Sequence, residues 1–181
     1  AAAASTATDA ATSSGHGDDV IDDIDFSIDS VYKVLCHLKP KFSSGPDGYS
    51  AFFLKNVASN IAFPLALLFS QSFCSSRVPA VWKHAIVTPA FKKGNASDAN
   101  NYRPISLTCI CCKVMETIIK KQVLDFLLLH NKINKQQHGF LARHSTCSQL
   151  IESVNDWSIA LNARKPVDVV YVDFSKAFDS V

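Results

Sequence analysis

The chain has 181 residues, of which 48% are hydrophobic, 10% aromatic and 19% charged. This composition is typical of a globular protein with one domain-sized core, and it excludes a fibrous or wholly disordered chain. The formal net charge of +2 is unevenly distributed, because the first 30 residues carry seven acidic and no basic side chains and the remainder therefore carries +9. A basic body of this kind favours a polyanionic partner.

Several protein classes are excluded by simple patterns. The N-terminus has neither the basic nor the apolar region of a secretory signal. The longest apolar run, Ile61–Phe69, is interrupted by Pro64 and is too short to span a bilayer. The six cysteines indicate neither a zinc site nor a disulfide framework, so we interpret them as reduced cysteines of an intracellular protein.

The first quarter of the chain combines an acidic leader with helical patterns. Residues 1–26 are expected to form a disordered leader or linker, because they are acidic and low in complexity. Ser27 is a candidate N-cap for a short amphipathic helix that must end before Pro40. A dense turn signal at Ser44–Gly48 follows. The apolar spacing then predicts one helix within 49–61 and a second over 65–74.

A β-hairpin is predicted next. Residues 85–91 and 102–107 have strand character and flank a polar loop of turn-forming residues at 94–101. Each arm contains a proline, which predicts that part of the hairpin lies at a sheet edge. Lys92 and Lys93 end the first arm and Arg103 begins the second. The hairpin therefore concentrates three cations near its tip.

The last third of the chain has two helical patterns and one strand pattern. The stronger helix is predicted over 112–131, with one apolar stripe. After a loop at 136–140, another helix begins near Ser145, where Thr146 and Gln149 have capping-box spacing. Its residues expected to face inward are Leu150, Val154, Trp157 and Leu161. Residues 164–166 break this helix, and Val167–Phe174 is predicted to be a buried strand.

Asp173 is the first candidate functional residue. A carboxylate at the C-terminal end of an apolar strand lies where open α/β sheets bind ligands, and it would need a cation, a donor or a metal. The alternative is that Asp173 only caps the following turn. For Asp179 the default interpretation is a structural salt bridge or cap, and for Phe178 it is core packing.

The three cations of the hairpin form the second candidate group. Lys92, Lys93 and Arg103 are able to clamp a phosphate chain, Arg as a planar fork and Lys as a point charge. An ordinary solvated hairpin tip is the alternative. The functional interpretation is favoured by the stretch from Arg77 to Arg143, which has eleven basic against three acidic residues. Such a stretch suits a surface that follows a nucleic-acid backbone.

Five motifs together resemble one family. In chain order, they are Ser44–Gly48, Thr88–Gly94, Asn101–Leu107, Gln137–Phe140 and Val170–Asp179. In this order, they resemble motifs of the reverse transcriptases of non-LTR (LINE-type, jockey-like) retrotransposons. Each motif alone is weak, but the combination in one order is specific.

The resemblance implies a fold, an activity and partners. The fold would be the right-hand polymerase of the α/β (α+β) class, with residues 27–181 forming the fingers and the first palm strand. The activity would be RNA-directed DNA polymerisation, with an RNA template, a DNA primer and a deoxynucleoside triphosphate as partners and no membrane. The protein would be intracellular, in the nucleus or the cytoplasm.

The resemblance also implies roles for single residues. Asp173 matches the first catalytic aspartate, a ligand of two Mg²⁺ ions, and the backbone carbonyl of Phe174 matches a second metal contact. Phe178 matches a bulky aromatic beneath the incoming sugar. Lys92 or Lys93, with Arg103, match residues that hold the nucleotide triphosphate. The residues implied to lie near the template and nucleotide pocket are Gln137, Gly139 and Phe140.

One part of the family pattern has no counterpart. The second metal-binding strand, an aromatic residue followed by Ala and two aspartates, is absent from these 181 residues. One carboxylate cannot hold two Mg²⁺ ions, so the chain alone is expected to be inactive. An alternative function is a non-catalytic remnant that binds nucleic acid. Another is a phosphotransferase with Asp173 as nucleophile, similar to haloacid-dehalogenase-like enzymes, although these need an Asp where Ser175 stands.

Overall fold

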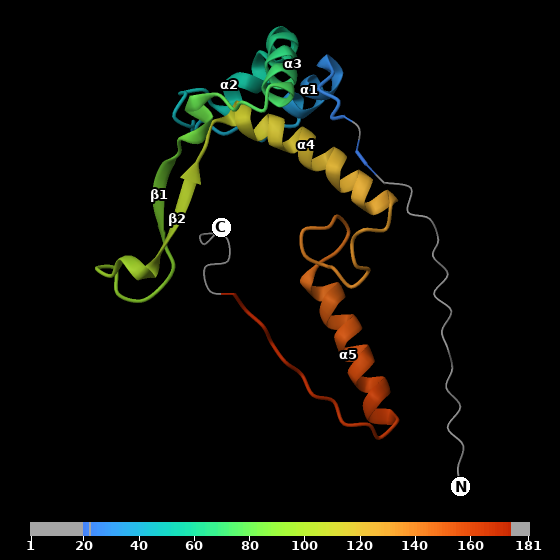
Figure 1. Cartoon of the computed structure of the whole chain (residues 1–181). Coiled ribbons are helices and arrows are strands. Elements are labelled where there is room, and N and C mark those ends of the chain that lie inside the picture. The colour runs from blue at the N-terminus through green and yellow to red at the C-terminus, as the bar shows by residue number, and fades with distance from the viewer. Residues whose placement is uncertain (1–19, 22, 175–181) are drawn as a thin grey trace. The chain divides into compact units, whose positions relative to one another are not determined.

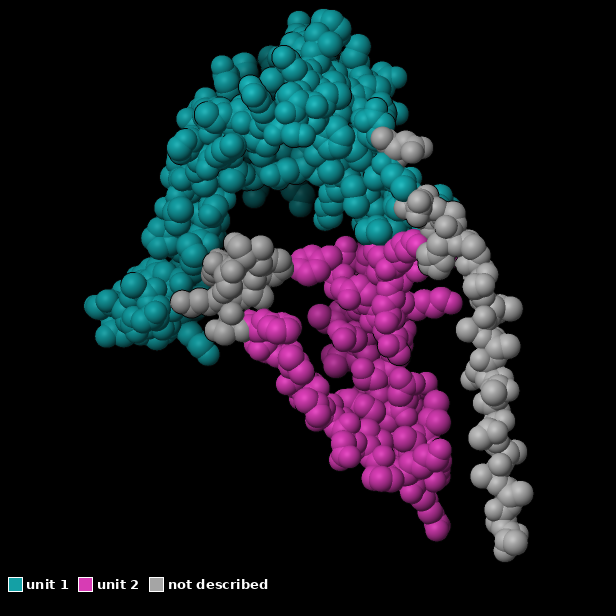
Figure 2. All heavy atoms as spheres, viewed as in Figure 1, with its two compact units in different colours: residues 1–130 teal, residues 131–181 magenta. Residues whose placement is uncertain are grey.

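A computed structural model of the chain describes residues 20–21 and 23–174 (Figure 1). The chain divides into two compact units, residues 1–130 and residues 131–181 (Figure 2). Among the described residues, the first unit contains four α-helices and a two-stranded antiparallel hairpin, and the second contains one long helix. The chain is thus mixed helix and strand. None of the helices in the described ranges has the length and apolar content needed to cross a membrane.

Helix α1, Ile28–Cys36, begins where the sequence predicts. The hydroxyl of Ser27 accepts a hydrogen bond from the Ser30 amide at 3.3 Å, which satisfies one of the unpaired amides of the first turn. The helix ends before Pro40 and buries Val31 and Leu35. The predicted N-cap is therefore confirmed.

The boundary between the next two helices differs from the prediction. Helix α2 spans Ala51–Asn56 and α3 spans Ala58–Cys74, so the break lies at Val57 and Pro64 is inside a continuous helix. A proline within a helix costs about 3 kcal/mol. That cost is offset because α3 buries one long face. Pro64 lies on the exposed side of the helix. The backbone carbonyl four residues earlier, which a proline cannot hydrogen-bond, can therefore reach water.

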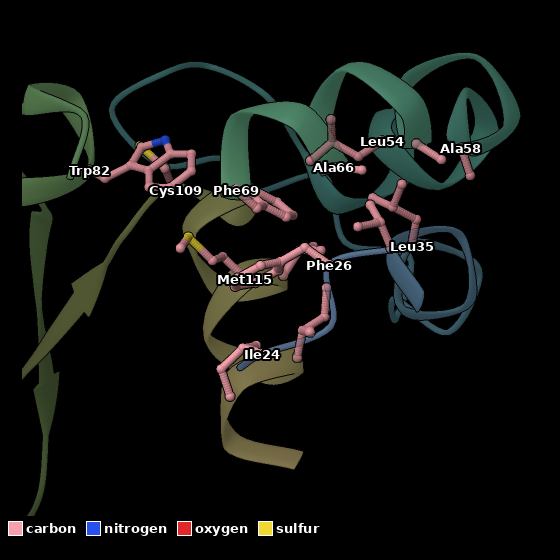
Figure 3. Packing of buried hydrophobic residues seen from close by; sticks show 14 residues of the cluster. Ile24, Phe26, Leu35, Leu54, Ala58, Ala66, Phe69, Trp82, Cys109 and Met115 are labelled. Carbon is pink, nitrogen blue, oxygen red and sulfur yellow. The ribbon is translucent and has the colours of Figure 1, made fainter. Parts of the chain in front are cut away.

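The core of the first unit forms where α1, α3 and α4 meet (Figure 3). Phe69 of α3 is fully buried, and its ring makes edge contacts with Phe26 at 6.0 Å and with Trp82 at 5.9 Å between ring centroids. Trp82 lies on a short 3₁₀ turn, Ala80–Lys83. Such aromatic contacts add to the free energy of apolar burial.

Helix α4, Ile110–Leu129, contributes its N-terminal half to this core through Val114, Met115 and Ile118. Farther along α4, the side-chain amide of Gln122 accepts a hydrogen bond from the Asp25 amide at 2.7 Å and donates one to the Asp25 carbonyl at 2.9 Å. Next to Asp25, Ile24 and Phe26 are buried, although the sequence places them in the acidic leader.

The hairpin has the predicted position. Strand β1, Ile86–Phe91, pairs with β2, Tyr102–Leu107, in an antiparallel register that places Pro89 opposite Pro104. The two strands form a sheet of their own, so both are edge strands, where proline is tolerated. A 3₁₀ turn, Ala99–Asn101, leads into β2.

The glycine of the predicted turn at Ser44–Gly48 packs against the junction between β2 and α4. A Cβ atom at Gly45 would lie 2.6 Å from the Thr108 carbonyl and 2.6 Å from the Cys109 amide. Both neighbours are backbone atoms and cannot rotate away. Gly48 differs, because its φ is +74° but a Cβ there would meet nothing within 4 Å.

We expect Gly45→Ala to lower the free energy of unfolding by about 3 kcal/mol, because the added methyl group overpacks a backbone junction. Gly48→Ala is the matched control and should cost about 1 kcal/mol, the strain of a left-handed alanine. Urea unfolding followed by circular dichroism measures both. An equal loss for the two variants would show that the close approach at Gly45 has no energetic weight.

In the second unit, α5 spans Thr146–Asn162 and begins with a reciprocal capping box between Ser145 and Ser148. The box lies one residue before the predicted one. The predicted inward face is not buried, because Leu150, Val154 and Leu161 are exposed and Trp157 is only half-buried. Among the described residues of this unit, no other helix or strand is available to cover that face. Helix α5 ends before Arg164–Pro166, as predicted.

The predicted buried strand over Val167–Phe174 is also not formed. The segment has no regular secondary structure, and Tyr171 and Val172 are more than three-quarters exposed. A strand requires a neighbour to satisfy its backbone groups. In the described ranges β1 and β2 are the strands, and they pair with each other.

Candidate functional site

Two of the three predicted cations share one face of the hairpin near its tip. Residues paired across the strands share a face, so Arg103 lies on the same side as its partner Ala90. The Lys92 amide donates to the Asn101 carbonyl at 2.8 Å, which extends the ladder by one position beyond Phe91. Strand alternation then places Lys92 on the face of Ala90 and Arg103. Lys93 lies beyond the ladder, in the bend that leads to the tip.

The opposite face of the hairpin is apolar. It forms an open hollow of about 560 Å³ that is lined mainly by Val87, Pro89, Tyr102 and Pro104. The Tyr102 hydroxyl donates to the Ala96 carbonyl at 2.9 Å, and its ring lies 5.4 Å from that of Phe91. Near its tip, the hairpin therefore has an apolar platform on one face and the cations Lys92 and Arg103 on the other.

The loop that carries these cations is ordered by its own polar side chains. Asn101 donates from its side-chain amide to the Asn95 carbonyl at 2.9 Å, and Asp98 accepts from the Asn100 amide at 2.9 Å. Gly94 has a φ of +96°, a conformation in which glycine is favoured. Lys92, Lys93 and Arg103 are exposed, and within the described ranges none of them forms an ion pair.

In the second unit, His138 connects the loop at 137–140 to α5. Its side chain is nearly buried; Nδ1 lies 3.0 Å from the Ser148 hydroxyl and Nε2 lies 3.0 Å from a Glu152 carboxylate oxygen. The Ser148 hydroxyl also donates to the Ser145 carbonyl at 2.8 Å. The ring of His144 lies 5.1 Å away.

These contacts were not predicted from the sequence. The available signal is weak: Ser148 and Glu152 are four residues apart and so share one helix face. Within the motif, Gln137 donates from its side-chain amide to the Gly139 carbonyl at 2.9 Å. Phe140 has a φ of 64° and an exposed ring. The histidine thus fixes the base of a loop that presents Phe140.

Three cysteines at the start of α4 are not candidate nucleophiles. Cys109 and Cys112 have the C-x-x-C spacing of redox and zinc sites, yet burial raises the pKa of the Cys109 thiol. Burial, reinforced by the negative charge of Asp47, raises the pKa of Cys111 to about 11. Burial and a hydrogen bond to Glu116 raise the pKa of Cys112 to about 12. Since the thiolate is the reactive form, these raised pKa values disfavour a nucleophilic role at neutral pH.

Asp173 and Phe174 belong to the second unit, and both are exposed. Phe178 and Asp179 lie outside the described residues. A carboxylate and a backbone carbonyl are oxygen ligands of the kind that Mg²⁺ takes. No group of three or more His, Cys, Asp or Glu within the described ranges is arranged to hold a metal. The donor chemistry of Asp173 fits the metal, but the described residues do not complete a site.

The structure therefore places the candidate residues on two units. Lys92 and Arg103 come together on one face of the hairpin in the first unit. The motif around His138 and the segment that ends in Asp173 are in the second unit, and each is described by itself.

The comparisons with known proteins identify the class. Residues 91–181, half of the chain, match the reverse transcriptase (RNA-dependent DNA polymerase) family. The matched region runs from the last residue of β1 through the hairpin and α5 to the segment with Asp173. The chain belongs to this family.

Its relatives specify the class further. The chain is 28% identical over 156 residues to the RNA-directed DNA polymerase from the mobile element jockey of Drosophila melanogaster. It is 26% identical over 155 residues to the probable RNA-directed DNA polymerase from transposon BS of the same species. These matches cover 86% and 85% of the chain and 17% of each relative. A third, at 28% identity over 171 residues, is the retrovirus-related Pol polyprotein from the type-1 retrotransposable element R1 of Bradysia coprophila. The resemblance to non-LTR retrotransposon reverse transcriptases is confirmed.

Proposed function

We propose that this chain is part of an RNA-directed DNA polymerase of a non-LTR retrotransposon, which extends a DNA primer along an RNA template. The family match over residues 91–181 carries this proposal. The chain spans about a sixth of the length of the relatives it matches, so the activity belongs to the longer protein. The chain alone is expected to bind substrates without extending a primer.

The β1–β2 hairpin is assigned to the fingers of this polymerase. The shared face of Lys92 and Arg103 supports a role in holding the triphosphate of the incoming nucleotide. Arg103 would offer a planar fork of donors and Lys92 a point charge. Fixed positive charge near the phosphates stabilises the charge that spreads over them during phosphoryl transfer. Because Lys93 lies outside the ladder, we assign this role to Lys92 rather than Lys93.

The segment that ends in Asp173 is assigned to the first strand of the palm. Its β-branched sequence supports this role, and we expect the strand to form when a neighbouring strand satisfies its backbone. The Asp173 carboxylate and the Phe174 carbonyl would then hold Mg²⁺. When bound, the metal would supply charge stabilisation at the reacting phosphate. Phe178 would lie beneath the sugar of the incoming nucleotide and disfavour a 2′-hydroxyl there.

The loop at 137–140 is assigned to the template and nucleotide pocket. Its attachment to α5 through His138 supports this role, because a pocket residue must be held in a fixed place to be useful. Gln137, Gly139 and Phe140 would form the part that faces the substrates. His138 would act as a positioning residue through the loop.

The hairpin assignment is tested by steady-state kinetics of the complete polymerase. Lys92→Ala and Arg103→Ala should each raise the KM for the deoxynucleoside triphosphate about tenfold, since a hydrogen bond to a charged group contributes about 1.5–3 kcal/mol. Lys93→Ala is the matched control and should change KM less than about twofold. A larger effect at Lys93 than at Lys92 would contradict the assignment.

A second candidate function is nucleic-acid binding without catalysis. This function is favoured by the stretch from Arg77 to Arg143, which has eleven basic residues and only three acidic ones. It predicts binding that weakens steeply with salt and no DNA synthesis in Mg²⁺ by the complete protein. The family match supports the polymerase over this function and over a phosphotransferase.

A further inference from the structure

A basic groove lies between α1 and α4, on elements other than the hairpin. It has a volume of about 450 Å³. Its polar lining consists of Lys33, His37 and Lys39 from α1 and the residues after it, and of Lys121 and Thr117 from α4. Val34 and Leu38 form its apolar floor. We call this feature the α1–α4 groove.

The charged side chains that line the groove itself are all cationic. No acidic residue lines it, and within the described ranges none of its three ammonium groups forms an ion pair. Asp25 and Asp125 line a neighbouring hollow, which shares Lys33 and Lys121 with the groove. The Asp25 carboxylate is already engaged by the hydroxyls of Ser27 and Ser30 at 2.9 and 2.8 Å. The acids therefore lie toward Lys33 and Lys121, whereas Lys39 does not line the hollow that contains them.

The backbone that carries these lysines is fixed. Helix α1 is anchored by Val31 and Leu35, which are fully buried, and α4 is anchored by the buried Ile118. The two hydrogen bonds between the Gln122 side chain and the Asp25 backbone also hold α4 to the segment that precedes α1. A ligand that binds between the helices would not need to order their backbone first, which reduces the free-energy cost of binding.

The histidine of the groove is held by the backbone of α1. His37 Nδ1 lies 2.7 Å from the Lys33 carbonyl oxygen. A carbonyl only accepts hydrogen bonds, so Nδ1 is the donor and the ring is fixed beside Lys33. With three flexible point charges, the lining suits successive phosphate oxygens better than a single flat anion.

We propose that the α1–α4 groove binds the phosphate backbone of the RNA, as a contact separate from the hairpin. This proposal rests on the proposed function for the choice of RNA, and on the groove itself for the choice of a polyanion. Lysine contacts to phosphate hold a strand without reading its sequence. The groove would therefore bind the RNA whatever its sequence and increase the affinity of the fingers for the template.

The test measures binding of a fluorescent 30-nucleotide single-stranded RNA to the 181-residue chain at several salt concentrations, without Mg²⁺ or nucleotides. The test variant is Lys33→Gln/Lys39→Gln/Lys121→Gln. The matched control is Lys83→Gln/Lys135→Gln/Lys165→Gln, which removes the same charge at exposed positions outside the groove. Circular dichroism confirms that both variants keep their helices.

The groove variant should lose about two units of the slope of log K against log salt, because each phosphate contact in a single strand contributes about 0.7. Its affinity at low salt should fall at least about tenfold, and the control should change less than about threefold. Equal losses in the two variants would show that only net charge matters and would overturn the proposal. Equally tight, groove-dependent binding of polyglutamate would overturn the choice of RNA.

These outcomes are independent of catalysis. If the groove variant binds RNA as the unmodified chain does while the complete polymerase is active, the groove proposal fails and the proposed function stands. If groove-dependent RNA binding is found but the complete protein does not synthesise DNA, the groove proposal stands and the polymerase function fails.

Discussion

Replacement of Asp173 by asparagine in the complete polymerase is expected to reduce RNA-templated DNA synthesis at least about a thousandfold. Asparagine keeps the size of the side chain and removes the negative charge that would hold Mg²⁺. Loss of metal stabilisation amounts to several kcal/mol in the transition state, and each 1.36 kcal/mol corresponds to a factor of about ten in rate. Single-turnover primer extension measures the effect.

Asp168→Asn provides the control for this variant. Asp168 is also exposed and lies on the same segment, five residues before Asp173. Its substitution should change the rate less than about threefold, as expected for a surface position away from the chemistry. If Asp173→Asn retained a tenth or more of the activity, Asp173 would not be the metal ligand.

The largest expected effect on stability is that of Phe69→Ala in α3. This ring is fully buried between Phe26 and Trp82, so its removal leaves a cavity in the centre of the first unit. Such substitutions cost about 3–5 kcal/mol, a large part of the stability of a domain of this size. Urea unfolding is monitored by tryptophan fluorescence in a Trp157→Phe background, so that the signal comes from Trp82, which contacts the ring.

Phe63→Ala is the matched control, because Phe63 lies on the same helix and is 56% exposed. Its loss should change the free energy of unfolding by about 0.5 kcal/mol or less. Comparable losses of unfolding free energy at the two positions would mean that α3 does not bury the face that contains Phe69.

Features that depend on neighbouring residues were predicted correctly from the sequence. The N-cap at Ser27 and the two arms of the hairpin follow from local turn and strand chemistry, and both are present. The helix break expected near Pro64 is absent. The free-energy cost of a proline in a helix can be seen from the local sequence. The burial of Phe69 and of the alanines of α3, which outweighs this cost, depends on contacts with distant residues.

Features that depend on distant partners were predicted poorly. The apolar positions of α5 and the β-branched run before Asp173 have the correct local pattern, but burial and pairing require other elements to cover them. His138 illustrates the opposite error. No sequence motif marks this residue. Its structural role, which is to attach the loop at 137–140 to α5, follows from its contacts with Ser148 and Glu152.

The most direct test of the proposed function is an assay of the complete protein with a DNA primer annealed to an RNA template, Mg²⁺ and the four deoxynucleoside triphosphates. The proposed function predicts DNA products that reach the end of the template and that disappear when the RNA or the metal is omitted. Absence of any extended primer, from a folded preparation that binds the same primer and template, would contradict it.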